Sequence, residues 1–164
     1  MCGAKCHIFD VGGKMQSIWE RYYDDCDGII FCWKLGGESN QSQTDDNDSD
    51  DEEMIREQQE GFRKQQELLL QVRQAIPDDV PFLILGHVHG NVNAELVNQF
   101  YDTAGILPYY HNPLTTFCCG SAKTGAGIKY AMEWIIPMAK RQHKERVLST
   151  GDTSTSGSNN YKAT

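Results

Sequence analysis

Residues 8–35 read IFDVGGKMQSIWERYYDDCDGIIFCWKL, and the predicted fold depends on this stretch. A short apolar run ends at Phe9, two glycines follow, and an amphipathic segment of helical length leads to a second apolar run at residues 28–35. This order predicts a strand, a tight turn, a helix and a strand. Because glycine has no Cβ, such a turn lets backbone approach a ligand closely. Asp10 is a candidate to hold a metal-bound water, and the amide of Gly13 is a candidate to face an anion.

The length and composition permit one domain. The chain has 164 residues, 39% of them hydrophobic, which is enough for a single core. The sequence contains neither an apolar run of transmembrane length nor the apolar core of a signal peptide. It also starts without the Met-Gly of a myristoylation signal. We therefore expect a cytoplasmic protein with no transmembrane segment and no direct membrane anchor.

Charge is concentrated in one segment. The net charge is −8, and seven of the 23 acidic residues lie between Asp45 and Glu53. The rest of the chain is close to neutral and is not expected to form a basic face, so no nucleic-acid binding is expected.

Two segments are predicted to be disordered. Residues 36–53 are polar and acidic, with too few apolar side chains to offset the entropy of ordering. This insertion is either a solvated loop without a partner or an acidic docking loop for a basic partner. Residues 147–164, rich in Ser, Thr, Gly and Asn, are expected to form a disordered tail.

The remaining chain alternates helices and strands. Apolar periodicity predicts helices and strands at residues 54–76, 80–85, 93–104, 114–119 and 127–145 in the order helix, strand, helix, strand, helix. Pro137 is expected to kink the last helix or lift its end. This alternation predicts an α/β fold with a mostly parallel sheet flanked by helices.

Two separated motifs resemble the same protein family. Residues 10–23, DVGGKMQSIWERYY, resemble the switch II region of the ADP-ribosylation factor (Arf) family of small GTPases, especially its Arf-related and Arf-like branch. Residues 120–128, GSAKTGAGI, resemble the guanine-contacting loop of that family. The two motifs occur in the family's order. The resemblance implies a P-loop GTPase-like fold and a partial small-GTPase domain over residues 1–146.

The resemblance also implies a function. It implies a GTP-binding protein of intracellular vesicle traffic, peripheral to Golgi membranes, with GTP or GDP and magnesium as cofactors. In such switches the γ-phosphate and magnesium order two loops, and hydrolysis releases them. The implied nucleotide-binding residues are Asp10 (through water to magnesium), Val11, Gly12, Gly13, Lys14, His87, Gly90, Ser121, Ala122 and Lys123. Exchange factors, GTPase-activating proteins or effectors are the implied partners, through a switch II surface of Phe9, Trp19, Tyr22 and Tyr23.

The phosphate-binding motif of this family is absent. The pattern Gly-x-x-x-x-Gly-Lys followed by Ser or Thr occurs nowhere, and the family places it before switch II. We hypothesise that the chain is truncated at its N-terminus. The family's first strand normally separates the two strands predicted in residues 8–35, and its loss leaves backbone groups unpaired. Alternatively, those two strands pair directly.

Two further departures concern hydrolysis and guanine selectivity. Lys14 stands near the position of the family's catalytic glutamine and can only donate hydrogen bonds, so whether the chain is an enzyme stays open and no catalytic residue is predicted. Residues 87–90, His-Val-His-Gly, stand where the family reads guanine with Asn-Lys-x-Asp. Because Gly90 offers no side-chain acceptor, guanine selectivity is expected to weaken.

Two other function classes remain open. The first is a nucleotide-free pseudo-GTPase that binds a partner permanently through the switch II surface, although Trp19 and Tyr22 can equally well serve only to pack the helix on the sheet. The second rests on residues 86–89, Gly-His-Val-His, which resemble the last metal-binding motif of calcineurin-like metallophosphoesterases. The other two motifs of that family are absent.

Overall fold

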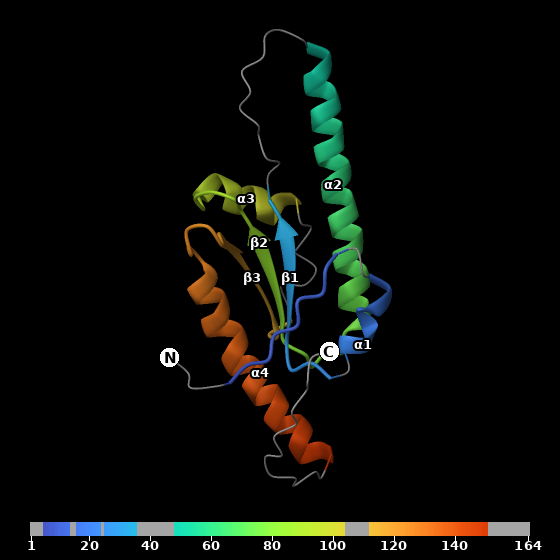
Figure 1. Ribbon diagram of the computed structural model, residues 1–164, viewed down its shortest axis with the longest axis vertical. Helices are drawn as coiled ribbons and strands as arrows, with labels where there is room; N and C mark the ends of the chain where they lie inside the picture. Colours follow the sequence, from blue (N-terminus) through green and yellow to red (C-terminus); the bar gives the residue numbers. More distant parts are fainter. Residues whose placement is uncertain (1–4, 14–15, 24, 36–47, 104–111, 151–164) are drawn as a thin grey trace, which may run out of the picture.

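Three parallel strands form the centre of the molecule (Figure 1). The computed structural model describes residues 5–13, 16–23, 25–35, 48–103 and 112–150. Within these, β1 (Ile29–Lys34), β2 (Phe82–His87) and β3 (Thr115–Gly120) lie side by side in sequence order. In register, Ile29 pairs with Phe82 and Phe82 pairs with Thr115. The predicted α/β fold with a parallel sheet is confirmed.

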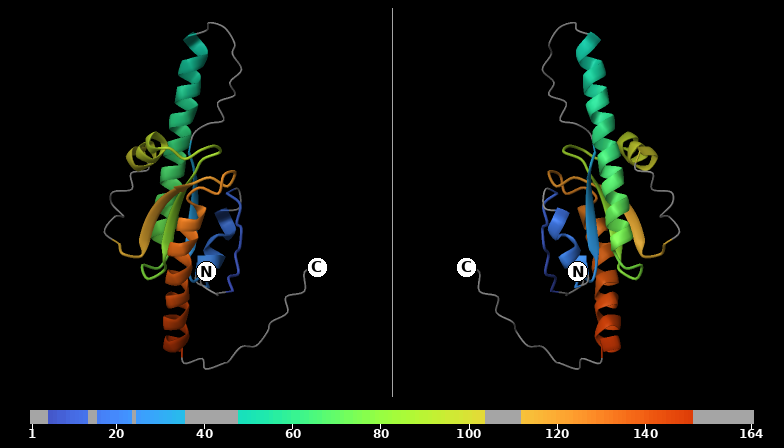
Figure 2. Two further views of the ribbon diagram at one scale, coloured as in Figure 1. Left: turned by 90° about the vertical axis from the view of Figure 1, so that its left-hand side faces the viewer. Right: turned by 90° about the vertical axis from the view of Figure 1, so that its right-hand side faces the viewer.

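Helices cover both faces of this sheet. The long helices are α2 (Asp48–Ala75), α3 (Ala94–Thr103) and α4 (Ile128–Thr150). Two short helical turns, η1 (Gln16–Ile18) and α1 (Glu20–Tyr23), precede β1. Figure 2 shows α2 and α4 as two long rods that extend beyond the sheet in opposite directions.

The core is divided into two clusters by the alternation of side chains along the strands. Phe82 and Ile84 of β2 belong to a cluster that also contains Leu69 of α2 and Phe100 of α3. The next residues along β2, Leu83 and Leu85, belong to a second cluster. Ala131 and Ile135 of α4 also belong to this second cluster. Since β2 is buried on both faces, its sequence is a continuous apolar run rather than an alternating one.

The strand predicted to end at Phe9 does not form. Residues 5–12 have no regular secondary structure, and the side chains of Ile8 and Phe9 are 76% and 71% exposed. In the described part of the chain β1 therefore has only β2 as a neighbour, and direct pairing of the two predicted strands is wrong. The apolar run is short and buries too little surface to offset the cost of fixing its backbone. On the outer edge of β1, the Gln65 side-chain amide accepts from the Lys34 N–H at 2.8 Å and donates to the Lys34 carbonyl at 3.4 Å.

Two helix boundaries differ from the predicted ones. α2 begins at Asp48 rather than at Met54, so the last part of the acidic segment is helical. Acidic residues are favoured near a helix N-terminus by the helix dipole, which composition alone did not reveal. α4 continues past Pro137 to Thr150, so the first residues of the predicted tail are also helical. The other residues of the two segments predicted to be disordered, 36–47 and 151–164, lie outside the described residues.

Candidate functional site

A tight loop follows β3 and leads into α4. The Ser121 N–H donates to the Ala126 carbonyl at 2.9 Å, and the Gly125 N–H donates to the Ser121 carbonyl at 2.8 Å. The Ser121 hydroxyl accepts from the Thr124 N–H at 3.4 Å, and its residue is fully buried. These three hydrogen bonds join six backbone and side-chain groups within the loop itself. Its shape is set by local interactions.

Two glycines make this loop possible. Gly125 and Gly127 have φ angles of 76° and 74°, in the left-handed region that side chains disfavour. A Cβ at position 127 would lie 2.0 Å from the Cys119 carbonyl oxygen, whereas a Cβ at position 125 would meet nothing within 4 Å. Neither glycine is among the residues predicted for the nucleotide site. The Gly-Ala-Gly spacing before a helix was the signal that could have found them.

The loop presents two backbone amides to solvent. Ala122 and Lys123 are exposed, and in the described part of the chain their N–H groups have no hydrogen-bond acceptor. Both follow the carboxyl end of β3. They are therefore available to an oxygen of a ligand at this edge of the sheet.

The end of β2 lies beside the same loop. His87 pairs in register with Gly120, and the Val88 N–H donates to the Gly120 carbonyl at 3.0 Å. Val88 is only 2% exposed and packs in the core, so it does not reach the surface. His87 is half-buried, and Gly90 is exposed with nothing within 4 Å of a Cβ built on it. The structure thus places His87, at the end of β2, next to the strand end from which the loop with Ser121 starts.

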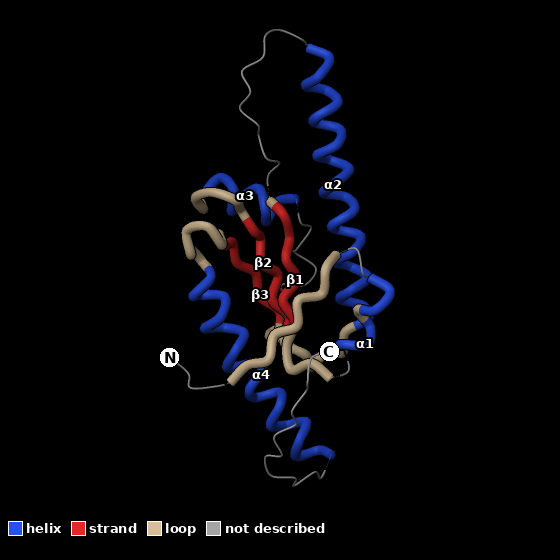
Figure 3. Tube along the Cα trace, in the orientation of Figure 1, coloured by secondary structure: helices blue, strands red, loops and turns tan. Residues whose placement is uncertain are grey.

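The predicted residues of the phosphate side lie in a different environment. Figure 3 draws residues 5–13 as a loop, and Asp10, Gly12 and Gly13 are exposed in it, with Val11 half-buried. Burial, followed by the negative charge of Asp10, raises the pKa of the Cys32 thiol in β1. The Gly12 carbonyl accepts from Trp19 Nε1 at 3.3 Å. Lys14 lies outside the described residues.

Known proteins are similar to most of the chain. It is 28% identical over 144 residues to ADP-ribosylation factor-related protein 1 of Bos taurus, and 27% identical over 143 residues to that of Rattus norvegicus. It is 25% identical over 140 residues to ADP-ribosylation factor-like protein 3 of Chlamydomonas reinhardtii. Each match covers 84% of this chain. The chain is therefore similar to small GTPases of the Arf family over most of its length.

The match to the Arf family is partial in length. The chain spans 60% of the length of the two Arf-related relatives and 67% of the Arf-like one. No family model matches the chain.

The two halves of an Arf-family nucleotide site differ in how well they fit a ligand here. On the base side, the unbonded amides of Ala122 and Lys123 suit an oxygen of a base, and the space beside Gly90 is open. On the phosphate side, Gly12 and Gly13 do not have the positive φ of an anion-cradling turn, and Asp10, Gly12 and Gly13 are all exposed outside any helix or strand. In this arrangement residues 10–13 do not fit a phosphate or magnesium site.

The aromatic residues of the predicted switch II surface fall into two pairs. Trp19 and Tyr23 pack against the larger core cluster, and burial, followed by the charge of Glu20, raises the pKa of Tyr23. Phe9 and Tyr22 instead lie on the surface, with ring centroids 5.7 Å apart. Only the second pair is available to a partner. The packing interpretation therefore applies to Trp19 and not to Tyr22.

Two adjacent thiols lie beneath the base-side loop. Cys118 is buried and Cys119 is half-buried, both in β3. Burial raises the pKa of each thiol from 9.0 to about 11, and for Cys118 the neighbouring Cys119 adds to this effect. Both thiols are therefore neutral at physiological pH, and the strand beneath the loop carries no thiolate charge there.

The metallophosphoesterase interpretation finds no support in the described residues. They contain no group of three or more His, Cys, Asp or Glu side chains placed to hold a metal ion, around His87 and His89 or elsewhere. In that same part of the chain, no helix is both long and apolar enough to cross a bilayer.

Proposed function

We propose that this protein acts in intracellular vesicle traffic as a guanine-nucleotide-binding member of the Arf family, with weakened selectivity for guanine. The observation that supports this proposal best is the base-side loop, where the amides of Ala122 and Lys123 are unbonded beside the end of β2. GTP or GDP is the ligand expected there, whereas residues 10–13 in this arrangement do not fit the magnesium that the family uses. Exchange factors, activating proteins and effectors are the expected partners.

The weakened selectivity has a specific cause. A guanine ring donates hydrogen bonds from N1 and from its exocyclic amine, and a carboxylate is the acceptor that satisfies both. Gly90 stands where that carboxylate is expected, and no side chain replaces it. A base oxygen can still accept from the loop amides. Such a site holds guanine and hypoxanthine almost equally well, because hypoxanthine lacks only the exocyclic amine.

The substitution Gly90→Asp tests this proposal by gain of function. A Cβ fits at this position, and the new carboxylate would accept from the guanine edge. We expect the preference for GDP over IDP to rise at least about tenfold, because a site built to accept from a donor discriminates against a base without it. The measurement is competition of GDP and IDP against a fluorescent GDP analogue on the full chain.

A matched control is Gly61→Asp in α2. It adds the same charge at a helix surface where a Cβ also meets nothing within 4 Å. It should leave the GDP-to-IDP ratio unchanged. If neither the parent chain nor the Gly90→Asp variant binds the fluorescent nucleotide, guanine-nucleotide binding by this polypeptide is ruled out.

A second candidate is a pseudo-GTPase that binds a protein partner without nucleotide. Its specific support is the exposed aromatic pair, since Phe9 is 71% and Tyr22 is 38% exposed. Large exposed aromatic side chains are enriched at protein interfaces. The double substitution Phe9→Asp and Tyr22→Asp should abolish recovery of a partner that binds equally with GDP, with GTP and without nucleotide. Leu70→Asp, at a 40% exposed position of α2, is the control.

A further inference from the structure

One face of α4 is exposed along the length of the helix. On the inner side of its C-terminal half, Arg146 and His143 pair with Asp27, and the Gln142 side chain donates to Asp79 at 2.8 Å. These contacts hold the helix against the loops at the amino ends of β1 and β2. The opposite face therefore points to solvent.

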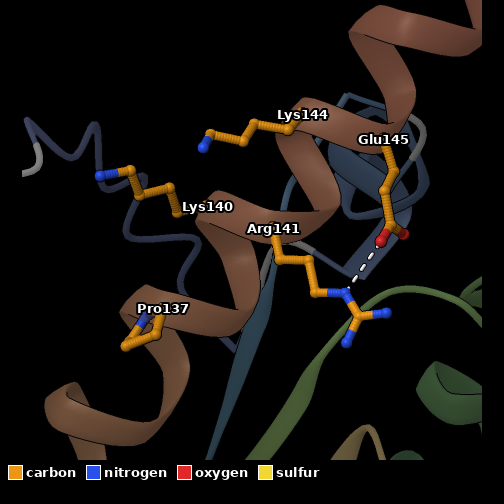
Figure 4. Close-up of a pocket in the computed structure, with 5 residues that line it drawn as sticks. All are labelled: Pro137, Lys140, Arg141, Lys144 and Glu145. Carbon is orange, nitrogen blue, oxygen red and sulfur yellow. Dashed lines mark hydrogen bonds and ion pairs between the residues drawn. The ribbon is translucent and has the colours of Figure 1, made fainter.

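This outer face is basic. Figure 4 shows Lys140 and Lys144 extending from α4 in the same direction, with Pro137 one turn before them. Arg141 lies beside them and pairs with Glu145 at 2.8 Å. In the part of the chain that the structure describes, neither lysine has an acidic partner. The five residues border a shallow depression of about 350 Å³.

Exposed apolar side chains continue the same face. Helical spacing places Tyr130, Pro137 and Lys144 seven residues apart along one line, and Leu148 follows one turn after Lys144. Tyr130 is 59% exposed and Leu148 is 81% exposed. We define the α4 outer stripe as Tyr130, Pro137, Lys140, Arg141, Lys144 and Leu148. It combines unpaired positive charge with an aromatic ring and a leucine at its ends.

We propose that the α4 outer stripe is a docking surface for a bilayer of anionic lipids, on which α4 lies in the plane of the headgroups. A helix with lysines and exposed apolar side chains on one face suits this position, because the apolar groups enter the acyl boundary while the charges meet the headgroups. The inference does not depend on nucleotide binding.

The charge distribution favours a membrane over an acidic protein. The one arginine of the stripe, which is the residue suited to bidentate recognition of a carboxylate, is already paired with Glu145. The two free cations are flexible lysines, which suit a diffuse layer of negative charge. The acidic residues at the start of α2 lie at the end of the molecule opposite to the C-terminal half of α4 (Figure 1). An anionic bilayer would therefore attract one end of the protein and repel the other, which orients it.

Vesicle binding by the full chain tests the proposal. The two preparations are phosphatidylcholine alone and phosphatidylcholine with about 30% phosphatidylserine, at about 0.1 M salt. We expect binding only to the anionic vesicles and its loss at about 1 M salt, where screening reaches about 3 Å. Lys140→Ala with Lys144→Ala should lower the partition coefficient about 10- to 30-fold, and Leu148→Ser about fivefold.

Two control variants separate charge from folding. Lys140→Arg with Lys144→Arg keeps the charge and should bind as the parent does. Lys34→Ala with Lys64→Ala removes the same charge from β1 and α2 and should also bind normally. Equal binding to neutral vesicles, or no loss with the Lys140 and Lys144 alanine pair, would overturn the proposal. So would retention on immobilised polyglutamate without any binding to anionic vesicles, since that result assigns the stripe to an acidic protein.

Discussion

The loop after β3 and the segment at residues 5–13 each contain part of a motif that resembles the Arf family. They differ in the interactions that fix their backbones. The first is fixed by hydrogen bonds among residues 121–126 and by two glycines with positive φ. The second has no regular secondary structure, and a bond from Trp19 Nε1 to the Gly12 carbonyl is its one side-chain hydrogen bond in the described residues. A loop whose hydrogen bonds join its own residues can form independently of distant segments. A motif that must join a sheet requires a neighbouring strand.

The largest expected effect is on the loop after β3. Gly127→Ala would place a Cβ 2.0 Å from the Cys119 carbonyl oxygen at a φ of 74°. We expect a loss of more than about 3 kcal/mol in the free energy of unfolding, or no folded protein, because backbone must move. Gly125→Ala has the same φ strain without the clash and should cost about 1–2 kcal/mol. Urea unfolding measures both, and equal losses would show that the loop is not tightly held.

High pH should destabilise the sheet beneath the same loop. Below pH 9 the Cys118 and Cys119 thiols are protonated in the folded and unfolded chains alike. Between pH 9 and about 11 the unfolded chain releases protons that the folded chain retains, because burial raises both pKa values to about 11. The free energy of unfolding must then fall as the pH rises through this range. Urea midpoints at pH 8 and pH 10.5 measure the fall.

The double variant Cys118→Ala with Cys119→Ala is the control for this pH effect. It retains every other group that titrates at high pH, including Tyr23, whose pKa is also raised. The fall in urea midpoint should be smaller in this variant. An unchanged fall would assign the pH dependence to other groups.

A smaller effect is expected where residues 5–13 are anchored. Trp19→Phe keeps most of the packing and removes the Nε1 donor to the Gly12 carbonyl. The expected loss is about 0.5–1.5 kcal/mol, since one hydrogen bond is removed at a partly buried site. Amide hydrogen exchange should also accelerate near Gly12. Unchanged exchange there would mean that other contacts hold the segment.

The smallest effect is expected at the exposed ring of Phe9. The side chain contacts Tyr22 but is 71% exposed, so Phe9→Ala should change the free energy of unfolding by less than about 0.5 kcal/mol. Thermal unfolding compared with the parent chain measures this change. A loss above about 2 kcal/mol would contradict the described position of residues 5–13 and indicate that Phe9 is buried.

Local sequence was enough to predict most of the fold. The apolar run PFLILG marks a strand buried on both faces, and Leu69, Val72 and Ile76 mark the inner face of α2. The base-side loop follows from residues 120–128 because nearly all its hydrogen bonds join near neighbours. That His87 lies next to this loop was implied only by the resemblance, and in the structure it results from the parallel pairing of β2 with β3.

Three features depend on the tertiary structure alone. They are the absence of a strand at residues 8–9, the choice of which aromatic side chains are buried, and the choice of which α4 residues face solvent. Whether an apolar pair becomes a strand depends on a neighbour that local sequence does not contain. Trp19 and Tyr22 are both aromatic residues of one short segment, and only the folded structure shows that Trp19 packs against the core while Tyr22 is exposed. The basic residues of α4 are close together in sequence, and only the pairing of Arg146 and His143 with Asp27 shows which of them face solvent. Hydrogen bonds between neighbours in sequence can be predicted from the local sequence. Bonds between distant segments form only when the chain folds, so local sequence does not predict them.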